Sequence, residues 1–146
     1  MSQCKENILK SILFEPITFM NLVTSVGCSS ETVNKYVHEL ESQKKINYKK
    51  GKFKILYNPK LELEKIEFYE LMLNNAISST ISLLLHSKDL PQSEIEQKIL
   101  KSRPTDTRTL SILVTCDIVQ ILYHAPFKTY SIKNKPKIIS WIIQIS

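Results

Sequence analysis

The sequence predicts a mainly α protein with small β-hairpins, built from two similar halves that an acidic helical segment joins. Three observations carry this prediction. Apolar residues recur at helical spacing through most of the chain. Short runs of β-branched and aromatic residues flank a turn at two places, and the order of these patterns in the first half returns in the second. Gly occurs only 2 times in 146 residues, which argues against Gly-rich phosphate loops and tight barrels.

The first half begins with two predicted helices. Apolar spacing favours a helix over residues 6–14, and Pro16 ends it, because the residue before a proline avoids the helical conformation. Thr18 is suited to cap the next helix, since its hydroxyl accepts a bond from a free backbone N–H. Gly27 suits the left-handed position that follows this helix.

A third helix is predicted over residues 31–43, with Ser29 or Ser30 as its cap. Its apolar residues recur at positions i, i+4 and i+7, so they share one face of the helix. This inner stripe consists of Val33, Val37 and Leu40. The opposite face is polar and should meet solvent.

Two β-rich runs, residues 46–48 and 53–57, flank a turn that contains Gly51, and together they predict a hairpin. Positive charge gathers in this region. The lysines on the hairpin and just before it are Lys44, Lys45, Lys49, Lys50, Lys52 and Lys54.

Charge along the chain separates three segments. Residues 1–58 hold nine lysines against five glutamates, residues 59–86 have a net charge of −2, and residues 87–146 return to +4. Two basic blocks therefore flank an acidic middle. This pattern, together with the helical periodicities, predicts domains over residues 1–58 and 76–146 and a helical connector over residues 59–75.

The connector is predicted to begin at Pro59, a favoured first residue of helices. It is acidic and amphipathic, and Asn74 and Asn75 can interrupt it, so one long helix and two shorter ones both fit. A solvated face is predicted for its charged residues. They are Glu62, Glu64, Lys65, Glu67 and Glu70.

The second half repeats the pattern of the first. When the two halves are aligned, Leu90 corresponds to Ile17 at an offset of 73 residues. The pattern of the third helix aligns at an offset of 75, so that Ile112 corresponds to Val37. Under this alignment Leu110 and Leu113 lie away from the inner stripe. The helix is then apolar nearly all round, which favours a buried packing role for this half.

Residues 29–40, followed by Ile46 and residues 49–57, resemble the capped recognition helix and wing of winged helix-turn-helix DNA-binding proteins. The likeness covers residues 6–58. One departure is Lys45, where such domains commonly carry a glycine. The second half resembles the same fold more weakly, so the fold class implied for the whole chain is a tandem winged helix-turn-helix joined by the acidic connector.

This resemblance implies a sequence-specific double-stranded DNA-binding protein, most simply a transcriptional regulator. Helix 29–43 would enter the major groove and the Lys-rich wing 46–57 would contact phosphates. Asn, Lys and His side chains address base edges, and hydroxyls near a helix N-terminus suit phosphate. The expected DNA-binding residues are Ser29, Ser30, Thr32, Asn34, Lys35, His38, Lys49, Lys50, Lys52, Lys54, Arg103 and Arg108.

Two other functions fit the same fold. Tandem winged helices also serve as protein-interaction modules in assembly or polymerase-associated factors, and the apolar second half favours this alternative. Plasmid and viral replication initiators use the fold on origin repeats. The apolar segments 60–86 and 138–145 need a partner surface, so we expect a homodimer formed through them.

Enzyme chemistry has no starting point in this sequence. It contains no nucleophile elbow, zinc-protease motif, phosphate loop or dinucleotide fingerprint, and we expect no cofactor. The three histidines and three cysteines match no zinc spacing, so no metal is expected. An odd cysteine count without CxxC favours a reduced, cytoplasmic protein in which Cys28 and Cys116 are small core residues. No apolar run reaches the ~18 residues of a membrane helix.

Overall fold

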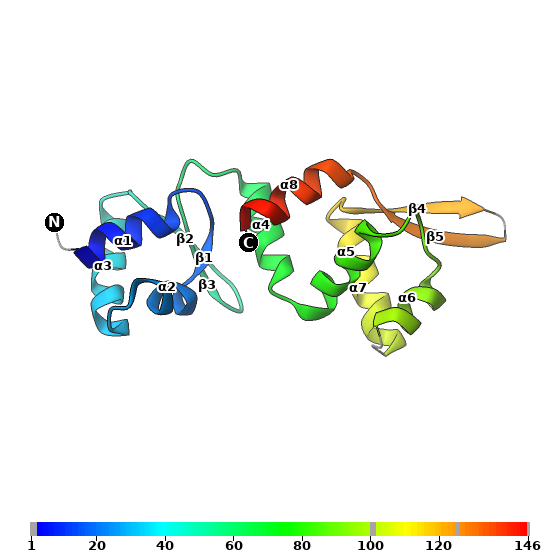
Figure 1. The fold of residues 1–146 in the computed structure, drawn as a ribbon, viewed down its shortest axis with the longest axis horizontal. Coiled ribbons are helices and arrows are strands. Elements are labelled where there is room, and N and C mark those ends of the chain that lie inside the picture. The colour runs from blue at the N-terminus through cyan, green and yellow to red at the C-terminus, as the bar shows by residue number, and fades with distance from the viewer. Residues whose placement is uncertain (1–2, 100–101, 125, 146) are drawn as a thin grey trace. The chain divides into compact units, whose positions relative to one another are not determined.

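The computed structural model describes residues 3–99, 102–124 and 126–145. Within these it contains eight helices and five strands, so the protein is mainly α with small antiparallel sheets (Figure 1). The chain divides into two compact units, Met1–Tyr69 with Gln144–Ser146, and Glu70–Ile143. None of the described helices combines the length and apolarity needed to cross a membrane.

The first unit follows the order helix, strand, helix, helix, strand, strand, helix. Its strands form a three-stranded antiparallel sheet in the order β1–β3–β2, in which Ile17 faces Leu56 and Lys50 faces Lys54. The elements are α1 (Gln3–Ile12), β1 (Ile17–Thr18), α2 (Phe19–Val26), α3 (Ser30–Ser42), β2 (Asn47–Lys50), β3 (Lys54–Tyr57) and α4 (Leu63–Met72), whose last turn belongs to the second unit.

The core of this unit forms where α1, α2 and α3 meet the sheet. The predicted inner stripe of α3 is confirmed, because Val33, Val37 and Leu40 are completely buried. The buried cluster is Ile8, Ile12, Leu22, Val33, Val37, Leu40, Ile46 and Leu56. Each such side chain contributes roughly 1.5–3 kcal/mol of burial free energy, and that burial fixes how α3 lies.

The predicted caps of α2 and α3 are also confirmed. The Thr18 hydroxyl accepts a 3.2 Å hydrogen bond from the N–H of Asn21, and the Ser29 hydroxyl accepts one of 3.2 Å from Thr32. Gly27 follows α2 with a φ of 71°, a left-handed conformation that costs glycine little. A short turn therefore separates two capped helices.

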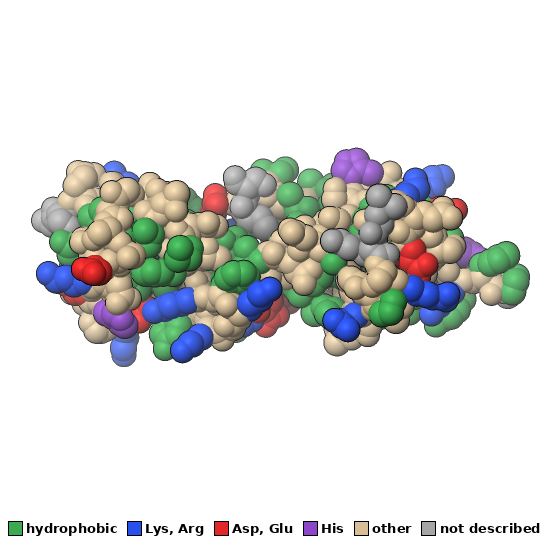
Figure 2. Space-filling view, turned by 90° about the horizontal axis from the view of Figure 1, so that it is seen from below, with side chains coloured by type: hydrophobic (Ala, Val, Ile, Leu, Met, Phe, Trp, Pro, Cys, Tyr) green, Lys and Arg blue, Asp and Glu red, His purple; other side chains and the backbone are tan. Residues whose placement is uncertain are grey.

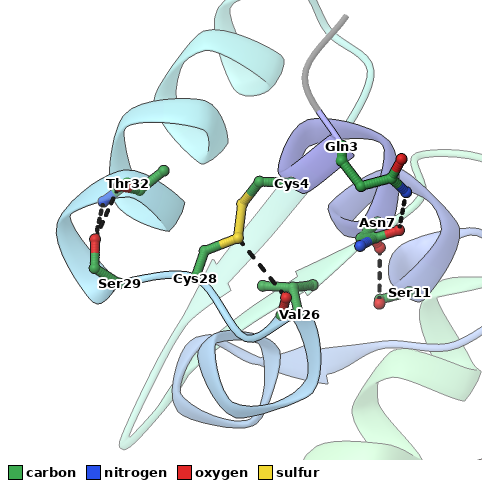
Figure 3. Close-up of a disulfide and its surroundings, with 8 residues drawn as sticks. All are labelled: Gln3, Cys4, Asn7, Ser11, Val26, Cys28, Ser29 and Thr32. Atoms are coloured by element: carbon green, nitrogen blue, oxygen red, sulfur yellow. Dashed lines mark hydrogen bonds between the residues drawn. A yellow bond between two sulfur atoms is a disulfide. The ribbon is translucent and has the colours of Figure 1, made fainter.

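A disulfide joins Cys4 on α1 to Cys28 in the turn between α2 and α3 (Figure 3). This corrects the expectation of a reduced Cys28, which is nevertheless partly buried and packed against the core. The fold brings the Cα atoms of the pair to 6.5 Å, within disulfide range, although 24 residues separate them in sequence. Cys116 was expected in the core as well, and it is exposed.

The connector differs from its prediction in two respects. Its first helix begins at Leu63, because the side-chain oxygen of Asn58 accepts the N–H of Lys60 and turns the chain there. Lys65 was assigned to a solvated face, but it is buried and its Nζ donates a 3.1 Å hydrogen bond to the carbonyl of Phe14. Leu63, by contrast, is 68% exposed.

The second unit repeats the order of elements of the first, except that a single bridge residue, Leu90, takes the place of β1. Asn74 caps α5 by accepting the N–H of Ile77, so the connector is interrupted there. Leu90 pairs with Tyr130 in an isolated antiparallel bridge, as β1 pairs with β3 in the first unit. The elements are α5 (Asn75–Leu85), α6 (Gln92–Ile99), α7 (Arg103–Thr115), β4 (Val119–His124), β5 (Phe127–Ile132) and α8 (Lys135–Ile145).

The two units repeat each other at a constant offset of 73 residues from the first helix to the end of the third. Ile81 and Ile95 are completely buried, as are Ile8 and Leu22, which lie 73 residues before them. The cap of α7 is Ser102, 73 residues after Ser29. Helix α7 also has the same length as α3, at 13 residues.

This constant offset corrects the predicted offset of 75 for the third helix. Leu110 and Leu113, expected away from the inner stripe, are its buried members and correspond to Val37 and Leu40. Ile112, expected inside, is only half-buried. The sequence misled because apolar residues on several faces of α7 allow two alignments, and buried Asp106 and Thr109 break the apolar stripe.

We predict that Cys28→Ser lowers the free energy of unfolding by about 3 kcal/mol, because the disulfide closes a loop of 24 residues and restricts the unfolded chain. The control is Cys116→Ser, which removes an exposed thiol and should change stability by less than ~0.5 kcal/mol. Urea unfolding without and with a reductant measures both. Equal midpoints for wild type and Cys28→Ser without reductant would contradict the prediction.

Candidate nucleic-acid interface

The exposed face of α3 carries three polar side chains capable of hydrogen bonding. Asn34, Lys35 and His38 are all exposed, on the side of the helix opposite Val33 and Val37. These three positions lie at i, i+1 and i+4, so they cluster on one surface. The polar face predicted from the sequence therefore meets solvent.

The N-terminus of α3 is partly occupied by its own hydrogen bonds. The Ser29 hydroxyl accepts from the Thr32 N–H and donates to the Thr32 hydroxyl over 2.8 Å, so both groups serve the cap (Figure 3). Ser30 is exposed at the first helical position, and Glu31 places a negative charge beside it. Among the three predicted hydroxyls, Ser30 is therefore the best placed to meet a phosphate.

The β2–β3 hairpin presents its lysines unequally. Lys50 and Lys52 are exposed at its turn, and Lys49 is half-buried. Lys54 is engaged within the unit. Its Nζ lies 3.2 Å from a Glu41 carboxylate oxygen and 4.7 Å from the centre of the Tyr48 ring. Lys54 therefore joins the hairpin to α3, and the outward positive charge of the hairpin comes from the other lysines.

An ion pair anchors α3 to α1. The Lys5 ammonium donates a 2.8 Å hydrogen bond to Glu39, and this bond, with the charge of Lys5, holds the pKa of the Glu39 carboxyl below its ordinary value of 4.5. Nearby Lys35 and Lys45 lower the pKa further. Glu39 is thus ionised at neutral pH and neutralises part of the local positive charge.

Several basic side chains lie on one side of the first unit. Figure 2 shows Lys or Arg side chains around a histidine on the surface seen there, with acidic and hydrophobic side chains between them. The ten predicted DNA-binding residues from Ser29 to Lys54 all belong to this unit. A positive surface of this kind raises the local concentration of polyanions.

Arg103 and Arg108 belong to the second unit and lie on α7. Both are exposed, and the Nε of Arg103 is 3.7 Å from a Glu96 carboxylate oxygen. Thr107 and Ser111 share this exposed face and were not predicted from the sequence. The sequence does contain a signal for them. A serine followed three residues later by a threonine begins both α3 and α7, and aligning these two caps places Thr107 and Ser111 at the exposed positions of α3.

No group of three or more His, Cys, Asp or Glu side chains that could hold a metal ion occurs in the part of the chain that the structure describes. The basic surface of the first unit offers hydrogen-bond donors and positive charge, which suit an anionic polymer.

A scan against models of protein families and a search of curated proteins found no match to this chain. Among solved structures, the DIP2311 protein from Corynebacterium diphtheriae matches 88% of this chain at a TM-score of 0.35 and 16% identity. The match covers 26% of DIP2311, so this chain spans about a quarter of that protein. ScpB from Mycobacterium tuberculosis matches 99% of this chain and 96% of its own length, at a TM-score of 0.36 and 12% identity. Likenesses at this level assign no function.

Proposed function

We propose that this chain is a sequence-specific duplex-DNA-binding protein that regulates transcription, with α3 as the recognition helix and the β2–β3 hairpin as the wing of a winged-helix domain. One observation carries the proposal. Asn34, Lys35 and His38 project from a helix whose opposite face is completely buried. The side chains that would meet DNA are thus held on a rigid support.

The dimensions of α3 suit the major groove. An α-helix with its side chains is about 10–12 Å in diameter and the groove is about 12 Å wide. Asn34 offers the paired donor and acceptor that match an adenine edge, and Lys35 offers donors for guanine acceptors. His38 lies one turn further along the same face and extends this surface.

The hairpin supplies the charge that sequence-independent binding requires. Lys50 and Lys52 are exposed at its turn, where phosphates flanking the groove can be contacted. Lys54 holds the hairpin against α3 through Glu41, so the two surfaces keep a fixed relation within the unit. Contacts to phosphate position such a protein, and contacts to bases specify its site.

The order of elements supports a winged-helix assignment for both halves. Three helices followed by a two-stranded hairpin is the arrangement that the sequence resemblance implies, and the structure adds a short strand, β1, before the second helix. The second unit replaces that short strand with the Leu90–Tyr130 bridge. We infer a tandem of two winged-helix domains that arose as a 73-residue repeat.

A protein-interaction module is the second candidate, and the β4–β5 hairpin favours it. Tyr123 and Phe127 near its tip are 76% and 68% exposed. Large exposed apolar side chains of this kind mark surfaces that bind other proteins. The salt dependence of binding to random duplex DNA distinguishes the two candidates. An affinity that falls steeply with salt supports DNA binding, because an apolar contact with a protein lacks that dependence.

We further propose a homodimer in which α8 takes part. Ile139 and Ile143 are exposed four residues apart on this helix, so they form one apolar stripe. A second copy of the chain presents the same stripe, and a two-fold axis brings identical patches together.

Changing Lys50 and Lys52 to Ala should weaken binding to all duplexes alike, because phosphate contacts carry little sequence information. The slope of log K against log salt should fall by about 0.9 for each phosphate that the variant no longer neutralises. Fluorescence anisotropy with a random-sequence duplex measures both quantities. The matched control replaces Lys10 and Lys60, two exposed lysines outside the hairpin, and an equally weakened control would show that the hairpin has no special role.

Replacing Asn34 with Ala should cost about 1–3 kcal/mol on a site selected from a random duplex pool, and much less on random DNA, because only base contacts distinguish the two. Gln43→Ala at the far end of α3 is the control and should leave both affinities unchanged. If Asn34→Ala weakened selected and random sites equally, α3 would be a backbone contact and not a recognition helix.

Ile143→Glu should convert the dimer into monomers, because it places a charge on a 72% exposed apolar position of α8. Met20→Glu alters a 70% exposed side chain of the first unit and should leave the dimer intact. Sedimentation velocity at micromolar concentration follows both variants. A wild-type protein that sediments as a monomer at that concentration would refute the dimer.

A further inference from the structure

Helix α7 presents a polar surface at the positions where α3 presents its own. Because the 73-residue offset holds from cap to cap, Asn34, Lys35 and His38 correspond one by one to residues of α7. The corresponding residues are Thr107, Arg108 and Ser111, all exposed. An offset of 75 would instead match the α3 positions to Thr109, Leu110 and Leu113, and so conceal this surface.

The two helices are supported in the same way. The Ser102 hydroxyl accepts a 3.3 Å bond from the Thr105 N–H and donates over 2.8 Å to the Thr105 hydroxyl, as Ser29 does with Thr32. Each helix is followed by a residue with positive φ, 59° at Lys44 and 64° at Asp117. Buried Leu110 and Leu113 fix the opposite side of α7. The cap and the buried face thus fix which side chains of α7 are exposed, as they do on α3.

The chemistry of this surface suits DNA. It is a shallow, open depression lined by Arg103, Pro104, Thr107, Arg108, Ser111 and Ile112, and the two arginines place positive charge beside a lining that is mostly apolar carbon. Asp106, the one carboxylate on α7, is buried on the other side. Arginine has a planar fork of donors that matches the acceptors of guanine and of phosphate. Hydroxyls both donate and accept, so they suit any base edge.

Side chains of α6 hold this surface in place. The Gln92 amide donates a 2.7 Å hydrogen bond to the Thr107 hydroxyl and one of 3.2 Å to Glu96. Glu96 in turn lies 3.7 Å from the Nε of Arg103. Thr107 and Arg103 are thus oriented before any ligand arrives, which lowers the entropy that binding must overcome.

We propose that the exposed face of α7 is a second duplex-DNA surface of this chain, with Arg108 contacting bases and Arg103 contacting phosphate. The proposal rests on the proposed function of α3. The β4–β5 hairpin lacks the cluster of lysines found on β2–β3 and carries only Lys128 in its strands. The second surface therefore adds less electrostatic affinity than the first.

The test uses the full chain with a random-sequence duplex and with sites selected from a random duplex pool. Replacing Arg103 and Arg108 with Gln should lower the salt slope on random duplex by about 0.9, because Arg103 is the arginine that contacts a phosphate. Arg108→Lys keeps the charge and removes the fork, so it should weaken the selected site by about 5- to 150-fold while having little effect on random DNA. The control replaces Lys133 and Lys137, two exposed lysines of the same unit, with Gln.

The outcomes separate this surface from the first one. If the arginine variants bind like the lysine control while the Lys50 and Lys52 variant binds weakly, the first unit binds DNA and the α7 proposal is overturned. If the wild-type chain binds no duplex at low salt, the proposed function fails and this surface fails with it. A salt slope and a selected-site affinity that both fall in the arginine variants, and not in the control, support the proposal.

Discussion

The arrangement of this protein depends on the burial of one face of a 13-residue helix, which occurs once in each unit as α3 and α7. Val33, Val37 and Leu40 are completely buried on α3, and each gains roughly 1.5–3 kcal/mol from leaving water. This burial fixes the rotation of the helix about its own axis. Once the rotation is fixed, the identities of the exposed residues are fixed too, so the core decides which side chains a partner meets.

Four further contacts stabilise the position of α3. Ser29 caps its start, the Cys4–Cys28 disulfide holds the turn before it, and the Lys5–Glu39 ion pair joins it to α1. Lys54 fastens the hairpin to it through Glu41. A surface that must present hydrogen-bond donors in a defined pattern gains from such rigidity, because less freedom is given up on binding.

The sequence predicted most of this from local signals. Caps at Thr18 and Ser29, the left-handed Gly27 and the inner stripe of α3 follow from short-range stereochemistry. Local sequence patterns do not predict contacts between segments that are distant in the chain. The disulfide at Cys28 and the buried ammonium of Lys65 arise only when the fold brings remote chain segments together. The alignment of α7 failed for a different reason, since apolar residues on several of its faces, together with buried Asp106 and Thr109, conceal its inner face.

The most direct measurement is an NMR titration of the isotopically labelled chain with a duplex of about 20 base pairs, long enough for nearly two turns of DNA. We expect the largest amide shift changes on the exposed face of α3 and the turn of the β2–β3 hairpin, with further changes on the exposed face of α7. Changes confined to the tip of the β4–β5 hairpin or to α8, or no changes at low salt, would contradict it.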